Sequence, residues 1–239
     1  MIYLYGLCYR ILQYADKTVE RLRETASEDF NLICVESKSY KSNDFLIWAK
    51  QKIKEKKIQK FISSSTNCKG DGLRWAIENI PPDDSEDFFI MTDLDLLVPK
   101  NVDWIKEIRD KIKNNVICGY TLSNENYVKP NWGWHENDVI QNKTFGTWLM
   151  GIKKEPFSKV LENLKKRKLQ IEDSLVIQEI CKYGKRDIID KKLYHLGWDS
   201  WKDDPYYWDD KQKIFPTNGW QKNKDEYDID EFPTYTLYE

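Results

Sequence analysis

The sequence predicts an α/β fold in which helices cover both faces of a mostly parallel central sheet. Two patterns in the first hundred residues predict it: short apolar runs alternate with amphipathic helical segments, and the apolar run at 88–92 carries no charged residue. A strand that is apolar throughout is typical of the buried centre of a parallel sheet. The alternation of strands and helices implies βαβ units, whose strands run parallel.

Each element of the first half follows from its residues. Strands are expected where apolar and β-branched residues cluster, at 2–7, 32–35, 61–63 and 88–92. Helices are expected where apolar residues recur at helical spacing, at 15–25, 45–57 and 71–79. Pro81 and Pro82 end the third helix. In the second helix, the spacing predicts that Ile47, Trp48 and Ile53 face inward while the lysines face solvent.

The second half is less regular. We expect, in order, a helix at 102–113, a strand at 116–120, a polar and aromatic loop at 123–144, a strand at 147–152, and helices at 157–168 and 173–183. From Trp198 onward the chain is rich in Trp, Tyr and Asp and shows little periodicity. We expect a single domain over 1–239 with an irregular, aromatic-rich C-terminal part.

Composition excludes several classes of protein. With 38 Lys and Arg against 40 Asp and Glu, the net charge of −2 excludes a uniformly basic nucleic-acid binder. No run of about 18 apolar residues exists, so no transmembrane helix is expected. The five cysteines form no C-x-x-C pair, which favours reduced thiols in a cytoplasmic protein. The lysine run at 50–60 is interpreted as the solvated face of a helix and leaves a weak contact with a membrane surface open.

The most specific motif is Asp93-Leu94-Asp95, which directly follows the apolar strand at 88–92. In open α/β sheets, ligands bind beyond the carboxyl ends of the strands. Two carboxylates spaced i, i+2 at that position can hold a hard divalent cation that also keeps phosphate oxygens as ligands. A second pair, Asp228 and Asp230, has no strand before it and is interpreted as surface.

Two further segments could bind an anion or accept a proton. The turn from Gly70 to Arg74 follows the third strand and opens a helix, where glycine allows close approach and the helix N-terminus favours anions. Glu172 and Asp173 precede the last helix, although acidic residues are common at helix N-termini for dipole reasons alone.

In their order and spacing, these motifs resemble family 2-like glycosyltransferases with the GT-A fold. The resemblance covers roughly residues 1–200 and includes the segments Tyr9-Arg10, Glu36, Gly70–Arg74, Asp93-Leu94-Asp95 and Glu172-Asp173. It implies a Rossmann-like, mixed but mostly parallel sheet flanked by helices. It also implies a nucleotide-sugar-binding half at 1–98, an acceptor and catalytic half at 99–200, and a C-terminal tail at 201–239.

The resemblance assigns roles to the first-half motifs. Donor-binding residues would be Tyr9, Arg10, Glu36, Gly70, Arg74, Asp93 and Leu94. Glu36 would accept a hydrogen bond from the base, and Arg74 would contact the base or the diphosphate. Two departures from the family pattern, Gly6–Arg10 and Glu36–Ser39, leave the base contacts and the nucleotide open between UDP and GDP types.

The resemblance also implies a metal ion and a catalytic base. Asp95 would ligate Mn²⁺ or Mg²⁺, with Asp93 beside it, and His195 would be an additional ligand because imidazole suits Mn²⁺ alongside carboxylates. Asp173 would be the general base of an inverting transfer, supported by Glu172. For His195, a core histidine satisfied by backbone is the alternative interpretation.

Ten Trp residues are unusually many, and seven of them lie between Trp132 and Trp220. Aromatic faces stack on sugar rings, and the resemblance implies an acceptor site that includes Trp132, Trp134, His135 and Trp148. For His135, a plain loop residue is the alternative interpretation. Most of the other Trp residues are expected to fill the core.

The leading prediction is therefore a metal-dependent glycosyltransferase that moves a sugar from a nucleotide-diphosphate donor to a glycan or other hydroxyl acceptor. One alternative is a non-enzymatic carbohydrate-binding protein on the same scaffold. A haloacid-dehalogenase-type phosphatase fits less well, because Leu96 stands where that family has Thr or Val. A sugar-nucleotide pyrophosphorylase would need a Gly-rich basic loop after the first strand, which Gly6–Arg10 does not supply.

Overall fold

The computed structural model describes residues 1–9, 11–36, 42–64, 69–122, 149–167, 173–196 and 234–239. The strands in this part of the chain are β1 (Ile2–Cys8), β2 (Phe30–Glu36), β3 (Lys60–Ser64), β4 (Phe88–Asp93), β5 (Leu96–Leu97), β6 (Ile117–Leu122), β7 (Met150–Lys153), β8 (Arg186–His195) and β9 (Tyr235–Tyr238). The helices are α1 (Leu12–Thr25), α2 (Ser42–Lys54), α3 (Lys69–Asn79), α4 (Trp104–Ile112), α6 (Lys154–Lys166) and α7 (Asp173–Ile180).

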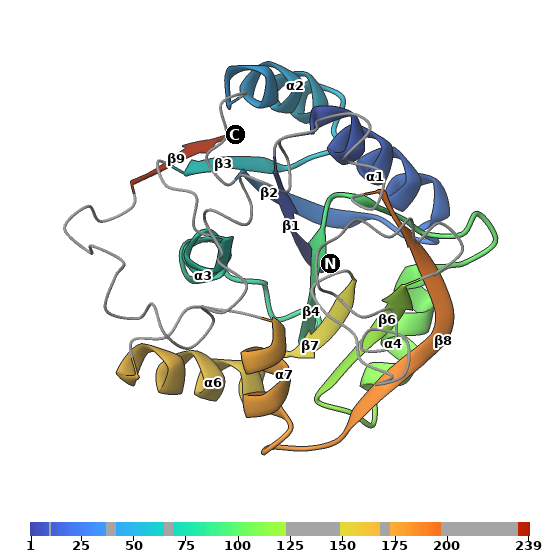
Figure 1. The fold of residues 1–239 in the computed structure, drawn as a ribbon, viewed down its shortest axis with the longest axis vertical. Helices are drawn as coiled ribbons and strands as arrows, with labels where there is room; N and C mark the ends of the chain where they lie inside the picture. The colour runs from blue at the N-terminus through green and yellow to red at the C-terminus, as the bar shows by residue number, and fades with distance from the viewer. Residues whose placement is uncertain (10, 37–41, 65–68, 123–148, 168–172, 197–233) are drawn as a thin grey trace, which may run out of the picture.

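The strands form one sheet in the order β5-β8-β6-β7-β4-β1-β2-β3-β9 (Figure 1). The four strands β3, β2, β1 and β4 run parallel. Antiparallel β7 separates β4 from β6, so β6 runs in the direction of β4, and β8 is parallel to β6. The predicted mixed, mostly parallel α/β sheet is therefore confirmed.

Strand direction brings six strand ends to one side of the sheet, called here the carboxyl edge. Strands β1, β2, β3, β4, β6 and β8 all end there. Strand β7 runs the other way and begins at this edge. A sheet of this kind places ligands beyond the carboxyl ends of its strands, so this edge is where a site is expected.

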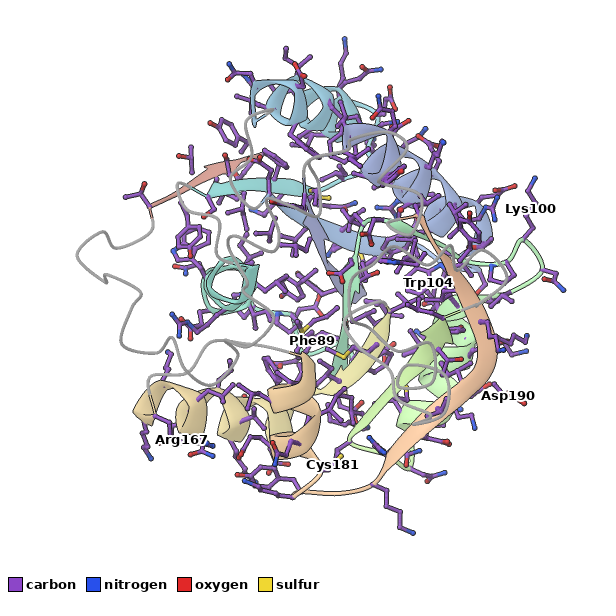
Figure 2. All side chains as sticks on the ribbon, viewed as in Figure 1. Phe89, Lys100, Trp104, Arg167, Cys181 and Asp190 are labelled. Carbon is purple, nitrogen blue, oxygen red and sulfur yellow. The ribbon has the colours of Figure 1, made fainter. Side chains whose placement is uncertain are left out.

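Two apolar layers hold the helices against the sheet. Helices α1, α2 and α4 cover one face, and α3, α6 and α7 cover the other (Figure 1). On the first face, the Trp104 ring meets Phe30 edge-on at 5.0 Å between centroids, and on the second Phe89 meets Phe157 at 5.0 Å. Trp104 and Phe89 are labelled in Figure 2. Burial on both faces explains why β1, β2 and β4 are almost wholly apolar.

The inward placement of Ile47 in α2 was wrong, because its side chain is 69% exposed. The buried residues of this helix are Phe45, Trp48, Ala49 and Lys52. These positions follow the i, i+3, i+4, i+7 spacing of one helical face, and Ile47 lies outside that stripe.

Strand β9 was missed by the sequence prediction, which treated the tail as irregular. It pairs antiparallel with β3 in the register Ser64↔Tyr235 and Phe61↔Tyr238, and so closes that end of the sheet. None of the helices in the described ranges has the length and apolar character needed to cross a membrane.

Candidate functional site

The carboxyl edge gathers the acidic residues predicted from the first half. In the register of the sheet, Leu7 of β1 is level with Asp93 of β4 on one side, and Cys8 is level with Glu36 of β2 on the other. The strand ends that carry Asp93 and Glu36 therefore flank the end of β1 directly. Each of the two carboxylates ends a strand, and parallel strands end at a common edge.

The Asp93-Leu94-Asp95 turn is packed tightly onto β1. The backbone N–H of Leu94 donates to the Leu7 carbonyl at 2.8 Å, and the Leu94 side chain is buried. A Cβ atom at Gly6 would lie 2.9 Å from Leu94 Cδ2, so a larger residue here would have to displace Leu94. The side chain of Leu94 thus belongs to the core, and the two aspartates on either side of it remain half-buried at the edge.

Asp95 and His195 are brought together by the pairing of β5 with β8. Leu96 is level with His195 in this antiparallel pair, and the Leu196 N–H donates to the Asp95 carbonyl at 2.7 Å. As a result, His195 Nε2 lies 3.2 Å from Asp95 Oδ2. The two side chains are 10% and 21% exposed, respectively.

This donor pair matches the chemistry expected of a first-row divalent cation, which accepts carboxylate oxygen and neutral imidazole nitrogen. The oxygen and the nitrogen are close enough together for both to contact one ion. Within the described ranges, no group of three or more His, Cys, Asp and Glu side chains is arranged to hold a metal ion. A bound ion would therefore need further oxygen ligands, such as the phosphates of a nucleotide.

Glu36 is fully buried at the end of β2. Its Oε2 accepts a hydrogen bond from the Ser63 hydroxyl at 3.1 Å. Next to it, burial raises the pKa of the Cys8 thiol well above its usual range, and the neighbouring Cys34 thiol and Glu36 charge raise it further. The surroundings of Cys8 therefore disfavour its thiolate form. With Cys118, Cys8 and Cys34 are free and buried, as expected of reduced cysteines.

The glycine-rich turn forms the start of α3, two residues earlier than predicted. Gly72 is the glycine that close packing requires, since a Cβ there would lie 2.9 Å from Val35 Cγ1 of β2. Gly70 is buried, and Arg74 is half-buried on the second turn. The N-terminus of α3, with its positive dipole end, therefore lies against the end of β2.

The C-terminal strand adds an aromatic pair beside this helix. The Tyr235 ring stacks on Trp75 of α3, with 5.0 Å between centroids and 25° between planes. The alternation of Tyr, Thr, Leu and Tyr at 235–238 is the signal that could have predicted this strand. Strand β9 is short, and its partner β3 lies far away in the sequence, so local sequence patterns indicate β9 only weakly.

Tyr9 and Asp173 are the remaining predicted residues that lie in the described ranges. Tyr9 is half-buried and packs in a cluster with Leu196, next to His195. Asp173 is the first residue of α7, as predicted, and α7 ends at Ile180 shortly before β8 begins at the opposite edge. Residues outside the described ranges are Arg10, Trp132, Trp134, His135, Trp148 and Glu172.

The chain matches no protein-family model and no curated protein. Solved structures do resemble it. The mannosyltransferase PcManGT from Pyrobaculum calidifontis, in complex with GDP-Man and Mn²⁺, has a TM-score of 0.56 at 14% identity, over 84% of this chain and 59% of that one. TarS from S. aureus has a TM-score of 0.55 at 14% identity, over 82% of this chain and 36% of TarS.

A nucleotidyltransferase also resembles the chain. The 4-diphosphocytidyl-2C-methyl-D-erythritol synthase from Anaerococcus prevotii has a TM-score of 0.52 at 10% identity, over 81% of this chain and 89% of the synthase. At such identities the likeness shows the fold alone, and this fold is the GT-A type shared by nucleotide-diphospho-sugar transferases. The chain spans less than two thirds of the length of PcManGT and of TarS.

Proposed function

We propose that this chain, which has the GT-A fold, is a metal-dependent glycosyltransferase that moves a sugar from a nucleotide-diphosphate donor to a hydroxyl group of a glycan or another acceptor. The observation that carries the proposal is the pairing of Asp95 with His195 at the carboxyl edge, beside Asp93. That edge is where an α/β sheet binds nucleotides. PcManGT, with the same fold, is in complex with GDP-Man and Mn²⁺.

The donor would lie across the ends of β1, β2 and β4. Glu36 would accept a hydrogen bond from the base, and Arg74 at the start of α3 would contact the base or the diphosphate. Tyr9, Arg10 and Gly70 would complete this half of the site, and Asp93 would contact the ribose or the donor sugar. One similar structure is TarS in complex with UDP-GlcNAc, at a TM-score of 0.51, so the nucleotide is open between UDP and GDP types.

Asp95, with Asp93 and His195, would hold a Mn²⁺ or Mg²⁺ ion whose charge stabilises the diphosphate as it leaves. Asp173 would accept the proton of the acceptor hydroxyl, with Glu172 supporting it. The hydroxyl oxygen forms a bond to the anomeric carbon, while the bond from that carbon to the diphosphate breaks and its electron pair leaves with the diphosphate. Attack from the opposite face inverts the configuration.

The acceptor would bind near the segment between β6 and β7. Strand β6 ends and β7 begins at the carboxyl edge, so the connecting residues leave from the site and return to it. This segment carries Trp132, Trp134, His135 and Trp148. Aromatic rings there would stack on the acceptor sugar.

Two alternatives remain to be tested against this proposal. The first alternative is a nucleotidyltransferase, because the fold resembles the synthase from Anaerococcus prevotii. Against it, the sequence after β1 lacks a Gly-rich basic loop. A carbohydrate-binding protein without transferase activity would need neither Asp95 nor a metal ion. The GT-A fold does not favour the haloacid-dehalogenase-type phosphatase.

Thermal melting with a panel of nucleotide sugars, with and without Mn²⁺, tests the proposal. A donor at 100 times its Kd stabilises by about 2.7 kcal/mol, which raises the Tm of a chain this size by about 5–10 °C. We expect that rise with one nucleotide class and only with the metal. A rise with CTP or another free triphosphate alone would favour the nucleotidyltransferase, and a rise with free sugars without metal would favour the binding protein.

A further inference from the structure

Thr18 of α1 makes an unusual contact with the strand that follows Asp95. Its hydroxyl donates to the Leu96 carbonyl at 2.8 Å and accepts from the Leu96 N–H at 3.0 Å. The side chain is fully buried. One hydroxyl therefore satisfies both backbone groups of a single residue, and that residue is the direct neighbour of Asp95.

The position of β5 explains why Leu96 needs this contact. Among the described residues, β5 is the terminal strand of the sheet, with β8 as its partner on one side. The Asp95 carbonyl faces β8 and accepts from the Leu196 N–H at 2.7 Å. In an antiparallel pair, the backbone groups of successive residues point to opposite sides, so those of Leu96 point away from β8. If the backbone N–H and carbonyl of Leu96 were buried without hydrogen-bond partners, they would lower the stability of the fold.

The peptide unit between Asp95 and Leu96 is thereby held at both ends. Its carbonyl, from Asp95, is bound by Leu196, and its N–H, from Leu96, is bound by Thr18. Because the Leu94 N–H on the other side of Asp95 is bound to the Leu7 carbonyl, holding this peptide restrains the Asp95 backbone and so limits the direction of its side chain. Because Leu96 is level with His195 in the register of β5 and β8, the same hydrogen bonds also fix the backbone facing His195.

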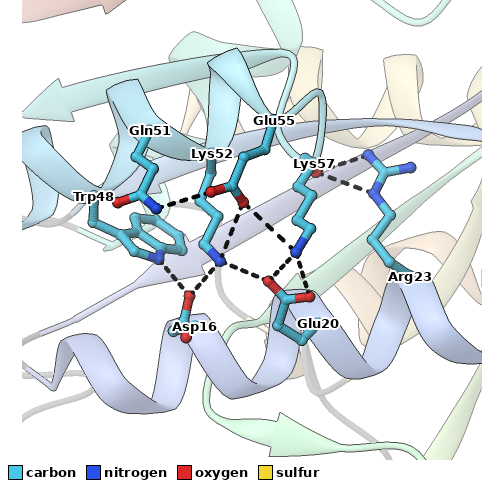
Figure 3. A network of polar contacts seen from close by, with 8 residues as sticks. All are labelled: Asp16, Glu20, Arg23, Trp48, Gln51, Lys52, Glu55 and Lys57. Carbon is cyan, nitrogen blue, oxygen red and sulfur yellow. Dashed lines mark hydrogen bonds and ion pairs between the residues drawn. The ribbon is translucent and has the colours of Figure 1, made fainter.

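Helix α1 is itself anchored, so Thr18 is presented from a fixed position. On the opposite side of the helix, Asp16 and Glu20 bind Lys52 of α2 at 2.8 and 2.6 Å (Figure 3). Nearer to the site, the Arg21 guanidinium donates to the Val98 carbonyl at 2.7 Å. Helix α1 thus holds the chain after Asp95 at two points while its far side is bound to α2.

We propose that Thr18 is a positioning residue, which sets the orientation of Asp95 toward His195 and thereby prepares the pair to hold a divalent cation. This inference rests on the proposed function for the role of the cation. The arrangement of the Asp95 and His195 pair in the metal-free protein does not depend on that function. The two parts can therefore be tested separately.

The test compares three variants in the full chain. Thr18→Val keeps the shape and removes both hydrogen bonds, whereas Thr18→Ser keeps the hydroxyl. Thr25→Val is the matched control, because the Thr25 hydroxyl lies on the same helix and donates to the Arg21 carbonyl at 2.7 Å, within the helix. If Thr18→Val does not fold, Thr18→Cys, with a weaker hydrogen-bonding group of similar size, takes its place.

The first readout is the imidazole NMR spectrum of the metal-free protein. The chain has two histidines, so a His135→Gln variant assigns both signals. We expect Thr18→Val or Thr18→Cys to shift the His195 signals, and Thr18→Ser and Thr25→Val to leave them in place. An unshifted His195 spectrum in folded Thr18→Val or Thr18→Cys would overturn the proposal.

The second readout is the affinity for Mn²⁺ in the presence of UDP or GDP, measured by calorimetry. Loss of a group that orients a metal ligand weakens metal binding about 10–100-fold, and we expect a loss in that range for Thr18→Val and none for Thr25→Val. Wild-type affinity in Thr18→Val would overturn the link between Thr18 and the cation. If the wild-type chain binds no Mn²⁺ with either nucleotide while Thr18→Val still shifts His195, the proposed function fails and the positioning role stands.

Discussion

Asp95 Oδ2 and His195 Nε2 lie 3.2 Å apart, although a hundred residues separate them in the sequence. Their meeting depends on a strand of only two residues, β5, and on its pairing with the end of β8. It places an oxygen and a nitrogen donor side by side at the edge where the parallel strands end.

Replacing His195 should weaken Mn²⁺ binding more than it lowers the rate of transfer at saturating Mn²⁺. In His195→Gln, one nitrogen donor to the cation is lost while Asp95 and Asp93 remain. We expect the Mn²⁺ concentration for half-maximal transfer to rise at least about tenfold, with a smaller loss at saturating Mn²⁺. Steady-state rates across a Mn²⁺ titration measure both quantities.

Asp190→Asn is the matched control for this variant, since Asp190 is an exposed carboxylate on the same strand, β8. It should leave the Mn²⁺ dependence unchanged. If the two variants behave alike, His195 is a structural residue of the core and not a metal ligand.

Asp173→Asn should separate binding from chemistry. The amide keeps the size of the side chain but cannot take the acceptor proton, and loss of a positioned base costs about 10²–10⁴-fold in rate. We expect the rise in Tm with donor and Mn²⁺ to persist and transfer to fall by that factor. Unchanged transfer would place the base elsewhere in the site.

Gly6→Ala should destabilise the fold by overpacking the core beneath the Asp93-Leu94-Asp95 turn. The new Cβ would lie 2.9 Å from Leu94, which is buried in the core. Overpacking of this kind costs about 1–3 kcal/mol, and urea unfolding measures it. Shortening the neighbour in a Gly6→Ala, Leu94→Val double variant should restore part of the loss, so the two changes should be less than additive. Strict additivity would contradict the contact.

The ion pairs between α1 and α2 predict a pH dependence of stability. Burial alone would raise the pKa values of Asp16 and Glu20, but hydrogen bonds and charge from Lys52 outweigh burial and lower both. Carboxylates with lowered pKa values stabilise the fold above their ordinary values of 3.8 and 4.5, and this stabilisation is lost as the pH falls through the folded values.

Lys52→Met should therefore be less stable than the wild type at pH 7, by about 1 kcal/mol because the carboxylates are partly exposed and screened. The two free energies of unfolding should converge as the pH falls below about 4. Lys54→Met, at an exposed position of the same helix, should stay close to the wild type at every pH. If the difference in free energy of unfolding between wild type and Lys52→Met stayed constant down to pH 3, the ion pairs of Lys52 with Asp16 and Glu20 would not contribute as proposed.

The sequence predicted the parts of the site that local patterns encode. Asp93 was predicted at the end of an apolar strand and is found there. Glu36 was named only through the family resemblance, and it too ends a strand, β2. Asp173 was predicted at a helix start and is found there.

The parts that depend on distant pairings could not be predicted in this way. A threonine inside a helix, such as Thr18, carries no sign of its partner, because its role arises from the terminal position of β5. Tyr235 reaches Trp75 only because β9 pairs with β3. Strand propensity depends on such neighbours, so a four-residue strand is not recognisable from its own residues.

The most direct test of the central claim is the binding of Mn²⁺ itself, followed by electron paramagnetic resonance as the free ion is titrated with protein and UDP or GDP. We expect the wild-type chain to take up one Mn²⁺ with one of the two nucleotides and Asp95→Asn to take up little or none at the same concentrations. Equal uptake by Asp95→Asn and wild type would contradict the claim that Asp95 and His195 hold the metal.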